Sequence, residues 1–156
     1  MVSLPVINQP LHRSGALLDH LARRMRQRGE SVLTPLGLRP RHLLMLTVLR
    51  DRGGCSQQAL SATLEMDGTN IVGLLNELEA NEFIERRRSP EDRRRHIVEL
   101  TDAGVRILAK AEFALAAVED HVLSALDKEQ RETLYTLLQL ASTGTTCAEA
   151  LSDPEC

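Results

Sequence analysis

The apolar residues of this chain recur mostly at the spacing of amphipathic helices. One such pattern spans about residues 11–28 and predicts a helix that ends near Gly29. Pro40 can then open a second helix, because the first turn of a helix does not need the N–H that proline lacks. Its segment HLLMLTVL is apolar nearly all round, which indicates burial on several sides, and Gly53-Gly54 should end it after about Arg52.

Two helices separated by a short turn are expected next. Ser56 is a suitable N-cap for a helix over Gln57–Leu64, and residues 65–68 form the turn. The second helix covers about residues 69–81, and its inner face is a single stripe of Ile71, Leu74, Leu75 and Leu78. Two helices joined by so short a turn predict a helix-turn-helix.

The outer face of the second helix carries small or hydrogen-bonding side chains. They are Thr69, Asn70, Val72, Gly73 and Asn76. A helix that faces only solvent usually carries Lys and Glu there, whereas short side chains suit a helix that enters the roughly 12 Å wide major groove of DNA. This face therefore favours DNA binding, although a solvated face remains the simpler alternative.

A β-hairpin and two further helices complete the predicted elements. Residues 83–88 and 96–100 are β-prone and flank an arginine-rich loop. Thr101 can cap a long helix whose apolar residues repeat in a 3-4 pattern. Asp127 and Gln130 resemble a capping box that starts a last helix, which ends near Gly144. The fold class is mainly α with a small β-hairpin.

The charge of the chain is unevenly distributed. Its 156 residues suit one domain, and its net charge of -3 alone would argue against a nucleic-acid partner. However, residues 1–95 hold 15 basic and 11 acidic residues, giving +4, and the remainder holds 4 and 11, giving -7. Within residues 86–95 there are six arginines and only two acids. This one segment therefore carries +4, and the basic charge of the chain is concentrated there.

Other function classes lack supporting motifs. No apolar run is long enough for a membrane span and no signal peptide is recognisable, so we expect a cytoplasmic protein. Cys55, Cys147 and Cys156 are too few and too far apart for a disulfide scaffold. We expect no metal site, no cofactor and no enzymatic activity, because no ligand spacing, phosphate-binding glycine loop or nucleophile motif is present.

The order of these elements resembles the MarR (multiple antibiotic resistance regulator) family. The segment NELEANEFIERRRSPEDRRRHIVELTDAG is similar to the family's recognition-helix end, wing and long-helix start. The resemblance implies a single domain with a winged helix-turn-helix core, flanked by N- and C-terminal dimerisation helices. The DNA-binding lobe would cover about residues 36–101, and the dimerisation helices about residues 8–30 and 102–144.

The resemblance also implies which residues meet DNA. Ser56 and Gln57 correspond to phosphate contacts, and the base-facing positions fall on Gly68, Thr69, Asn70, Val72 and Gly73. In the wing, Asp92 and Arg93 would shape the hairpin, while Arg94, with Arg95, would enter the minor groove. Many relatives carry arginine in the recognition helix and this chain has none. We therefore expect Asn70 to read adenine and Val72 or the Thr69 methyl to contact a thymine methyl.

The resemblance further implies a homodimer on a pseudo-palindromic operator, acting as a repressor that a small anionic or phenolic effector releases. Apolar stripes on the first and the last two helices independently favour pairing, since the small core cannot cover them all. His12, Arg23, Arg41 and His42 are candidate effector contacts. For Arg23 the alternative is a solvated face, and for His42 it is a packed polar residue.

Two alternatives to an effector-controlled regulator stay open. The first is a winged-helix protein-interaction module without DNA binding, which the absence of arginine from the recognition helix favours and the arginine wing opposes. The second is a thiol-redox sensor built on Cys55, for which a small structural cysteine is the competing interpretation.

Overall fold

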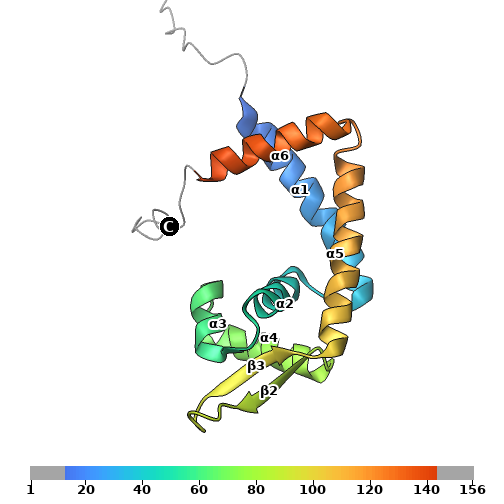
Figure 1. Ribbon diagram of the computed structural model, residues 1–156. Helices are drawn as coiled ribbons and strands as arrows, with labels where there is room; N and C mark the ends of the chain where they lie inside the picture. The colour runs from blue at the N-terminus through green and yellow to red at the C-terminus, as the bar shows by residue number, and fades with distance from the viewer. Residues whose placement is uncertain (1–12, 144–156) are drawn as a thin grey trace, which may run out of the picture. The chain divides into compact units, whose positions relative to one another are not determined.

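The computed structural model describes residues 13–143, which form seven α- or 3₁₀-helices and a small antiparallel sheet (Figure 1). The elements in chain order are α1 (Ser14–Leu33), η1 (Thr34–Leu36), α2 (Pro40–Arg52), β1 (Cys55–Ser56), α3 (Gln57–Leu64), α4 (Gly68–Ala80), β2 (Ile84–Arg88), β3 (His96–Leu100), α5 (Asp102–Val122) and α6 (Lys128–Thr143). The mainly helical class with a small β-hairpin is confirmed.

The first helix is longer than its sequence pattern predicts. Gly29 does not end α1, which continues to Leu33. Gly29 is buried, and a Cβ placed on it would lie 3.3 Å from Leu115 of α5. The glycine thus allows two helices to approach closely. The left-handed cap lies at Gly37, with φ of 72°, which ends η1.

The remaining helix boundaries follow the local capping signals closely. Pro40 is the first residue of α2, and Gly53 at its C-terminus has φ of 74°. Gly104 N–H donates to Thr101 Oγ1 at 3.0 Å at the start of α5. Short, local interactions set these ends, which explains why the sequence pattern located them.

The sheet has one strand more than the predicted hairpin. Its order is β1-β3-β2, with both pairs antiparallel. β1 is only two residues long, and Cys55 pairs with Val98. Gly54 precedes it at a close approach, because a Cβ there would lie 2.8 Å from Glu99 Oε1. So short a strand carries no alternating pattern and exists only through its partner.

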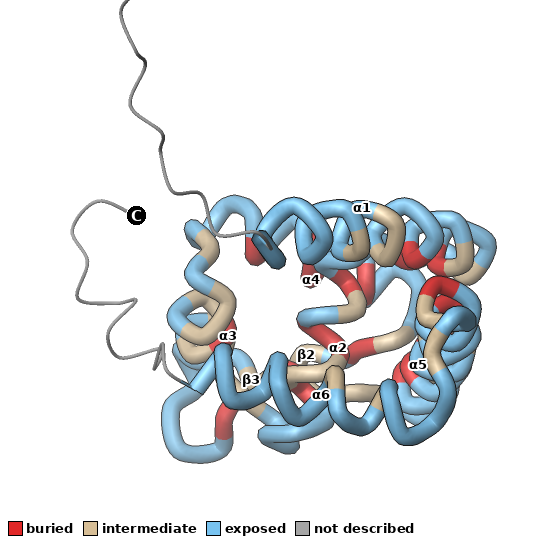
Figure 2. The backbone as a smooth tube through the Cα atoms, turned by 90° about the horizontal axis from the view of Figure 1, so that it is seen from above, coloured by how far each residue is buried: buried red, intermediate tan, exposed pale blue. Residues whose placement is uncertain are grey.

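Of the described residues, 13–118 form one compact unit with a continuous apolar core. The core combines α2, the inner faces of α3 and α4, the sheet and one side of α5, and Figure 2 shows buried positions on α2 and α5 while most of α1 is exposed. Its fully covered side chains include Met45, Leu46, Leu60, Ile71, Leu75, Val98 and Leu108. This packing buries the inner faces of α3 and α4 and so fixes the two helices of the helix-turn-helix on the rest of the unit.

Residues 119–143 belong to a second compact unit that contains α6. Asp127 and Gln130 make the predicted capping box: the Gln130 N–H donates to Asp127 Oδ1 at 2.9 Å and the Asp127 N–H donates to Gln130 Oε1 at 3.0 Å. Arg131 forms an ion pair with Asp120 at 2.6 Å. The division of the chain into a DNA-binding lobe and dimerisation helices remains a prediction.

Candidate nucleic-acid interface

Side-chain caps define the two helices of the helix-turn-helix. Ser56 Oγ accepts the Ala59 N–H at 3.1 Å at the start of α3. Glu65 ends α3 in the left-handed region, with φ of 50°, and the hydroxyl of Ser61 donates to Met66 O at 2.6 Å across the turn. Asp67 then caps α4, so this helix begins one residue earlier than the pattern predicted.

The two faces of α4 are sharply different. Ile71, Leu74, Leu75 and Leu78 are buried, as the apolar stripe predicts. The five predicted base-facing residues are all exposed: Gly68, Thr69, Asn70, Val72 and Gly73. No atom lies within 4 Å of where a Cβ would stand on Gly68 or Gly73. The start of α4 therefore presents open backbone and short side chains.

An ion pair from Arg39 and a hydrogen bond from His42 hold one end of α4 against α2. Glu77 of α4 accepts from Arg39, and Glu77 Oε2 lies 2.6 Å from Nε2 of the buried His42. The backbone N–H of Arg39 donates to His42 Nδ1 at 3.1 Å, so Nδ1 is an acceptor and the ring proton on Nε2 donates to Glu77. The hydrogen bonds from Arg39 and then from His42 hold the pKa of Glu77 below its ordinary value.

Arg86 of β2 holds α4 against the sheet. Its Nε donates to Glu79 Oε2 at 2.8 Å, and its Nη2 donates to Asn76 Oδ1. Arg86 and Asn76 thus form part of the scaffold of the interface. The sequence analysis counted Asn76 among the exposed residues of α4 and Arg86 among the basic residues of segment 86–95. In the structure, both side chains are occupied by hydrogen bonds within the chain.

The wing consists of β2, β3 and the loop over residues 89–95, with Arg88 opposite His96. Asp92 shapes the loop: Asp92 Oδ1 accepts the Arg94 N–H at 3.0 Å, and Asp92 O accepts the Arg95 N–H at 2.9 Å. Arg95 Nε also lies 3.7 Å from Asp92 Oδ2. The expected pair of Asp92 with Arg93 is therefore corrected, because the turn brings Arg94 and Arg95 to the carboxylate.

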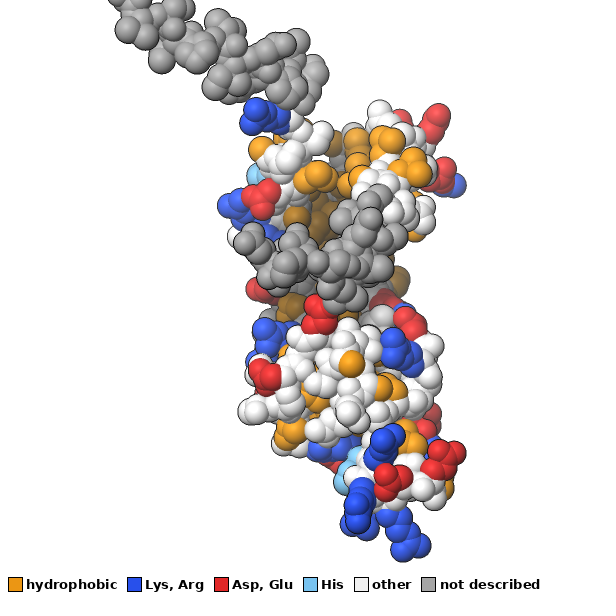
Figure 3. Space-filling model, turned by 90° about the vertical axis from the view of Figure 1, so that its left-hand side faces the viewer, with side chains coloured by type: hydrophobic (Ala, Val, Ile, Leu, Met, Phe, Trp, Pro, Cys, Tyr) orange, Lys and Arg blue, Asp and Glu red, His pale blue; other side chains and the backbone are white. Residues whose placement is uncertain are grey.

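The arginines of the wing differ in how far their charge is neutralised. Arg86 pairs with Glu79, and Arg87 pairs with Glu99, whose hydrogen bond raises the pKa of Arg87. Among residues 13–143, neither Arg93 nor Arg94 forms an ion pair. Figure 3 shows blue basic side chains gathering at the wing, at the bottom of the view. Arg88 at the end of β2 likewise forms no ion pair among residues 13–143, so the unneutralised charge lies in the loop and at the strand end beside it.

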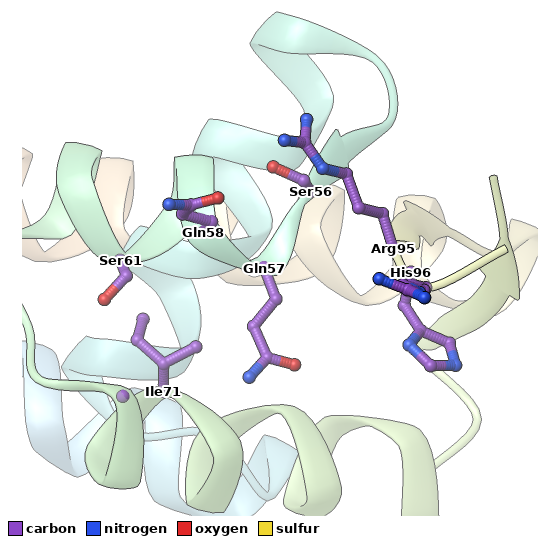
Figure 4. A pocket seen from close by; sticks show the side chains of 9 residues that line it. Ser56, Gln57, Gln58, Ser61, Ile71, Arg95 and His96 are labelled. Atoms are coloured by element: carbon purple, nitrogen blue, oxygen red, sulfur yellow. The ribbon is translucent and has the colours of Figure 1, made fainter. Parts of the chain in front are cut away.

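A hollow of about 440 Å³ lies between the start of α3, the start of α4 and the wing loop. It is lined by Ser56, Gln57, Gln58, Ser61, Gly68, Ile71, Arg94, Arg95 and His96, and Figure 4 shows Gln57 and Ser56 on the helical side and Arg95 and His96 on the wing side. The fold thus brings together five predicted DNA-contact residues from three segments. Gln58, Ser61 and His96 were not among the predicted contact residues. His96 could not be placed from the sequence, because only the folded wing brings it to α3.

The candidate effector residues do not form one site. Arg23 is exposed and pairs with Asp19 one helical turn away, and Arg41 is exposed. His42 is buried with both ring nitrogens hydrogen-bonded, which is the packed polar arrangement considered as its alternative. His12 lies outside the described residues.

The thiol of Cys55 is half-buried in β1, and burial raises its pKa. A raised pKa lowers the thiolate fraction and so the reactivity of the thiol. Cys147 and Cys156 lie outside the described residues. Between residues 13 and 143, no group of three or more potential ligands is arranged for a metal ion, and none of the helices has the length and hydropathy of a membrane span.

Comparison with known proteins agrees on one family. The model of the MarR family matches residues 36–95. The chain is 35% identical over 130 residues to a protein of Thauera aromatica named as a transcriptional regulatory protein for the hcr operon, covering 81% of this chain and 78% of that one. It is 28% identical over 141 residues to the transcriptional repressor NicR of Pseudomonas putida, covering 88% and 89% of the two chains.

A solved structure shares the fold. It is a cysteine-to-serine variant of MarR from E. coli in complex with operator DNA, with a TM-score of 0.66 and 21% identity, and the match covers 82% of this chain and 92% of that one. At this identity the likeness concerns the fold alone.

Proposed function

The chain belongs to the MarR family of winged helix-turn-helix transcription regulators, and from this premise we propose that it binds a pseudo-palindromic DNA site as a homodimer and represses transcription. One observation carries the proposal: the exposed start of α4 lies beside a wing loop whose Arg93 and Arg94 form no ion pair among residues 13–143. Short side chains suit the major groove, and unneutralised arginines suit the minor groove.

The remaining contacts of the hollow fit a phosphate backbone. Ser56 and Gln57 lie at the N-terminus of α3, where backbone N–H groups and the helix dipole favour anions. Arg95 lines the same hollow from the wing. We assign Ser56, Gln57 and Arg95 to phosphate contacts, which position the protein without reading sequence.

Exposed apolar side chains support dimerisation. In the first unit Leu17 of α1 and Phe113 of α5 are exposed, and in the second unit α6 exposes Tyr135, Leu137 and Leu140. Single exposed leucines are common, but rows of them on helices are typical of protein interfaces. A twofold dimer would present two copies of α4 to successive turns of the major groove.

We also propose that a small anionic or phenolic effector weakens DNA binding in the cytoplasm. Arg41 is the candidate contact best placed for this, because its side chain is exposed and makes no ion pair within residues 13–143. Titration of aromatic carboxylates into the protein–DNA complex, for wild type and Arg41→Ala, tests this part. Release of DNA from both proteins at equal concentrations would remove Arg41 from the effector site.

The experiment for DNA binding is selection of bound duplexes from a random-sequence library, followed by affinity and stoichiometry measurements on the selected duplex. We expect an inverted repeat whose half-sites are one helical turn apart and two protein chains per duplex. A reporter gene placed behind the selected site should be repressed by the protein. Failure to enrich any sequence would contradict the proposal and favour the protein-interaction module.

A further inference from the structure

Asp67 makes two hydrogen bonds to a single residue of α4. Asp67 Oδ1 accepts the backbone N–H of Asn70 at 2.8 Å, which is the N-cap bond. Asp67 Oδ2 accepts from the side-chain Nδ2 of the same Asn70, also at 2.8 Å. Both side chains are exposed at the start of α4. The first bond is ordinary capping, whereas the second acts on the amide that is predicted to read DNA.

The second bond fixes which way the amide points. An ionised carboxylate has only acceptors, so the amide nitrogen of Asn70 must face Asp67. A flipped amide would set Asn70 Oδ1 against Asp67 Oδ2, two acceptors without a proton between them. The orientation therefore follows from the chemistry of the partner, and it leaves Oδ1 and one N–H of Asn70 without a partner in the described chain.

A second asparagine on α4 shows that such orientation is set by partners. Asn76 Oδ1 accepts from the guanidinium of Arg86, which has only donors. Its amide is thus fixed by a donor, and that of Asn70 by an acceptor. Asn76 is engaged with the wing strand, while the free edge of Asn70 stays on the exposed face of α4.

A fixed donor–acceptor edge distinguishes bases in the major groove. Adenine presents the complementary pair, N7 as acceptor and the N6 amino group as donor, whereas guanine presents two acceptors there. If the amide could rotate, the point occupied by Oδ1 could also hold an N–H, which would donate to guanine O6 or thymine O4. A fixed amide excludes that exchange.

We propose that Asp67 is a positioning residue that fixes the side-chain amide of Asn70 and thereby makes Asn70 selective for adenine in each half-site. The inference rests on the proposed DNA-binding function. It assigns Asp67 a role in base selectivity in addition to capping α4, and it places the acidic residue beside the base-reading face without a direct contact to DNA.

The test compares Asp67→Ser and Asp67→Asn with wild type. Serine and asparagine are both good N-caps, so α4 should be retained. Neither residue is acceptor-only, so both release the constraint on Asn70. Each protein is used in selection from a random duplex library, and its affinity is then measured on the duplex selected by wild type and on versions with each other base at the Asn70 position.

Wild type should prefer adenine by about 5- to 100-fold, the range expected of a bidentate contact. Asp67→Ser and Asp67→Asn should reduce this preference to below about 3-fold, with melting temperatures close to that of wild type. Asn70→Ala should remove the preference, and Asp67→Ser in that background should change it no further. Asp127→Ser, the same change at the cap of α6, should leave the preference unaltered.

Different failures have different meanings. If wild type selects no sequence, the proposed function fails. If wild type selects a site and Asp67→Ser and Asp67→Asn weaken binding to all four bases equally, Asp67 is only a cap and this inference is wrong. An adenine preference retained in both Asp67 variants has the same consequence.

Discussion

Arg94→Ala is the substitution that most directly tests the wing. Asp92 binds the Arg94 backbone N–H, which holds residue 94 in the turn of the loop. The Arg94 side chain forms no ion pair among residues 13–143 and lines the hollow beside α3. Its charge is therefore available to DNA, and its loss should remove an electrostatic contact without disturbing an internal one.

The magnitude follows from counterion release. Each phosphate-equivalent contact contributes about 0.9 to the slope of log affinity against log salt concentration. A dimer has two wings, so the variant should lower the slope by about 1.8. Between about 50 and about 200 mM salt, a fourfold change, wild-type affinity should then fall about 12-fold more than that of the variant.

The assay is fluorescence anisotropy on the selected duplex over this salt range. Arg87→Ala is the matched control, because Arg87 is a wing arginine that is exposed but paired with Glu99. It removes the same formal charge from β2, and its slope should differ from that of wild type by less than about 0.5. The comparison separates a contact with DNA from a general change in net charge.

Two outcomes would refute this reasoning. An Arg94→Ala slope equal to that of wild type would remove Arg94 from the interface. Equal reductions for Arg94→Ala and Arg87→Ala would show that the ion pair with Glu99 does not withhold Arg87 from DNA. A second expected result concerns the base pairs under the wing. Replacing A·T by G·C pairs there should lower the DNA affinity of wild type more than that of Arg94→Ala, since a narrow A·T-rich minor groove attracts arginine.

Three further predictions concern the scaffold. A Cβ on Gly104 would lie 2.0 Å from Phe83 O, so Gly104→Ala should lower the free energy of unfolding, measured by denaturant titration, by about 1–3 kcal/mol. The control is Gly15→Ala in the first turn of α1, where nothing lies within 4 Å of the new Cβ; it should change the free energy of unfolding by less than about 0.5 kcal/mol. Equal effects of the two substitutions would contradict the clash at Gly104. Ser56→Ala should lower the free energy of unfolding by about 0.5–2 kcal/mol, because the Ala59 N–H loses its side-chain acceptor. An unchanged free energy of unfolding would show that water satisfies this N–H equally well. The pKa of Glu77 is lowered on folding, so its ionised form stabilises the folded protein fully above the ordinary glutamate pKa of about 4.3, and this stabilisation is lost as pH falls through the folded-state pKa. Glu77→Gln should therefore make the free energy of unfolding fall less steeply with decreasing pH in acid. Parallel pH profiles of wild type and variant would refute this.

Local signals explain how much of the fold the sequence could predict. Pro40, Ser56 and Thr101 mark helix starts through interactions within three residues, and the structure confirms each. Gly29 was misread because glycine has two uses: a left-handed cap, or a close approach between helices. Only the position of Leu115, 86 residues further along the chain, decides between them.

The candidate site shows the same division between local and distant partners. The exposed face at the start of α4 followed from the apolar stripe on the opposite side, since a helix has one inner face. The pairing of Arg87 with Glu99 required the hairpin register, which places Arg87 opposite Ile97 and so diagonal to Glu99 on the same face. Turn geometry sets that register, and the arginine-rich loop carried no signal for it.

These pairings change what the +4 charge of residues 86–95 means. The segment contains six arginines and only two acidic residues, but Glu79 and Glu99, which lie outside it, form ion pairs with Arg86 and Arg87. Arg86 and Arg87 are thus committed to holding the wing and α4 in place, and the charge left for DNA belongs to the loop and to Arg88 at the end of β2 beside it. A uniform basic surface would bind any duplex through its phosphates, whereas arginine gathered at the tip of the wing can reach only the minor groove and the phosphates that border it. Acidic partners that lower the total charge therefore favour discrimination between DNA sites.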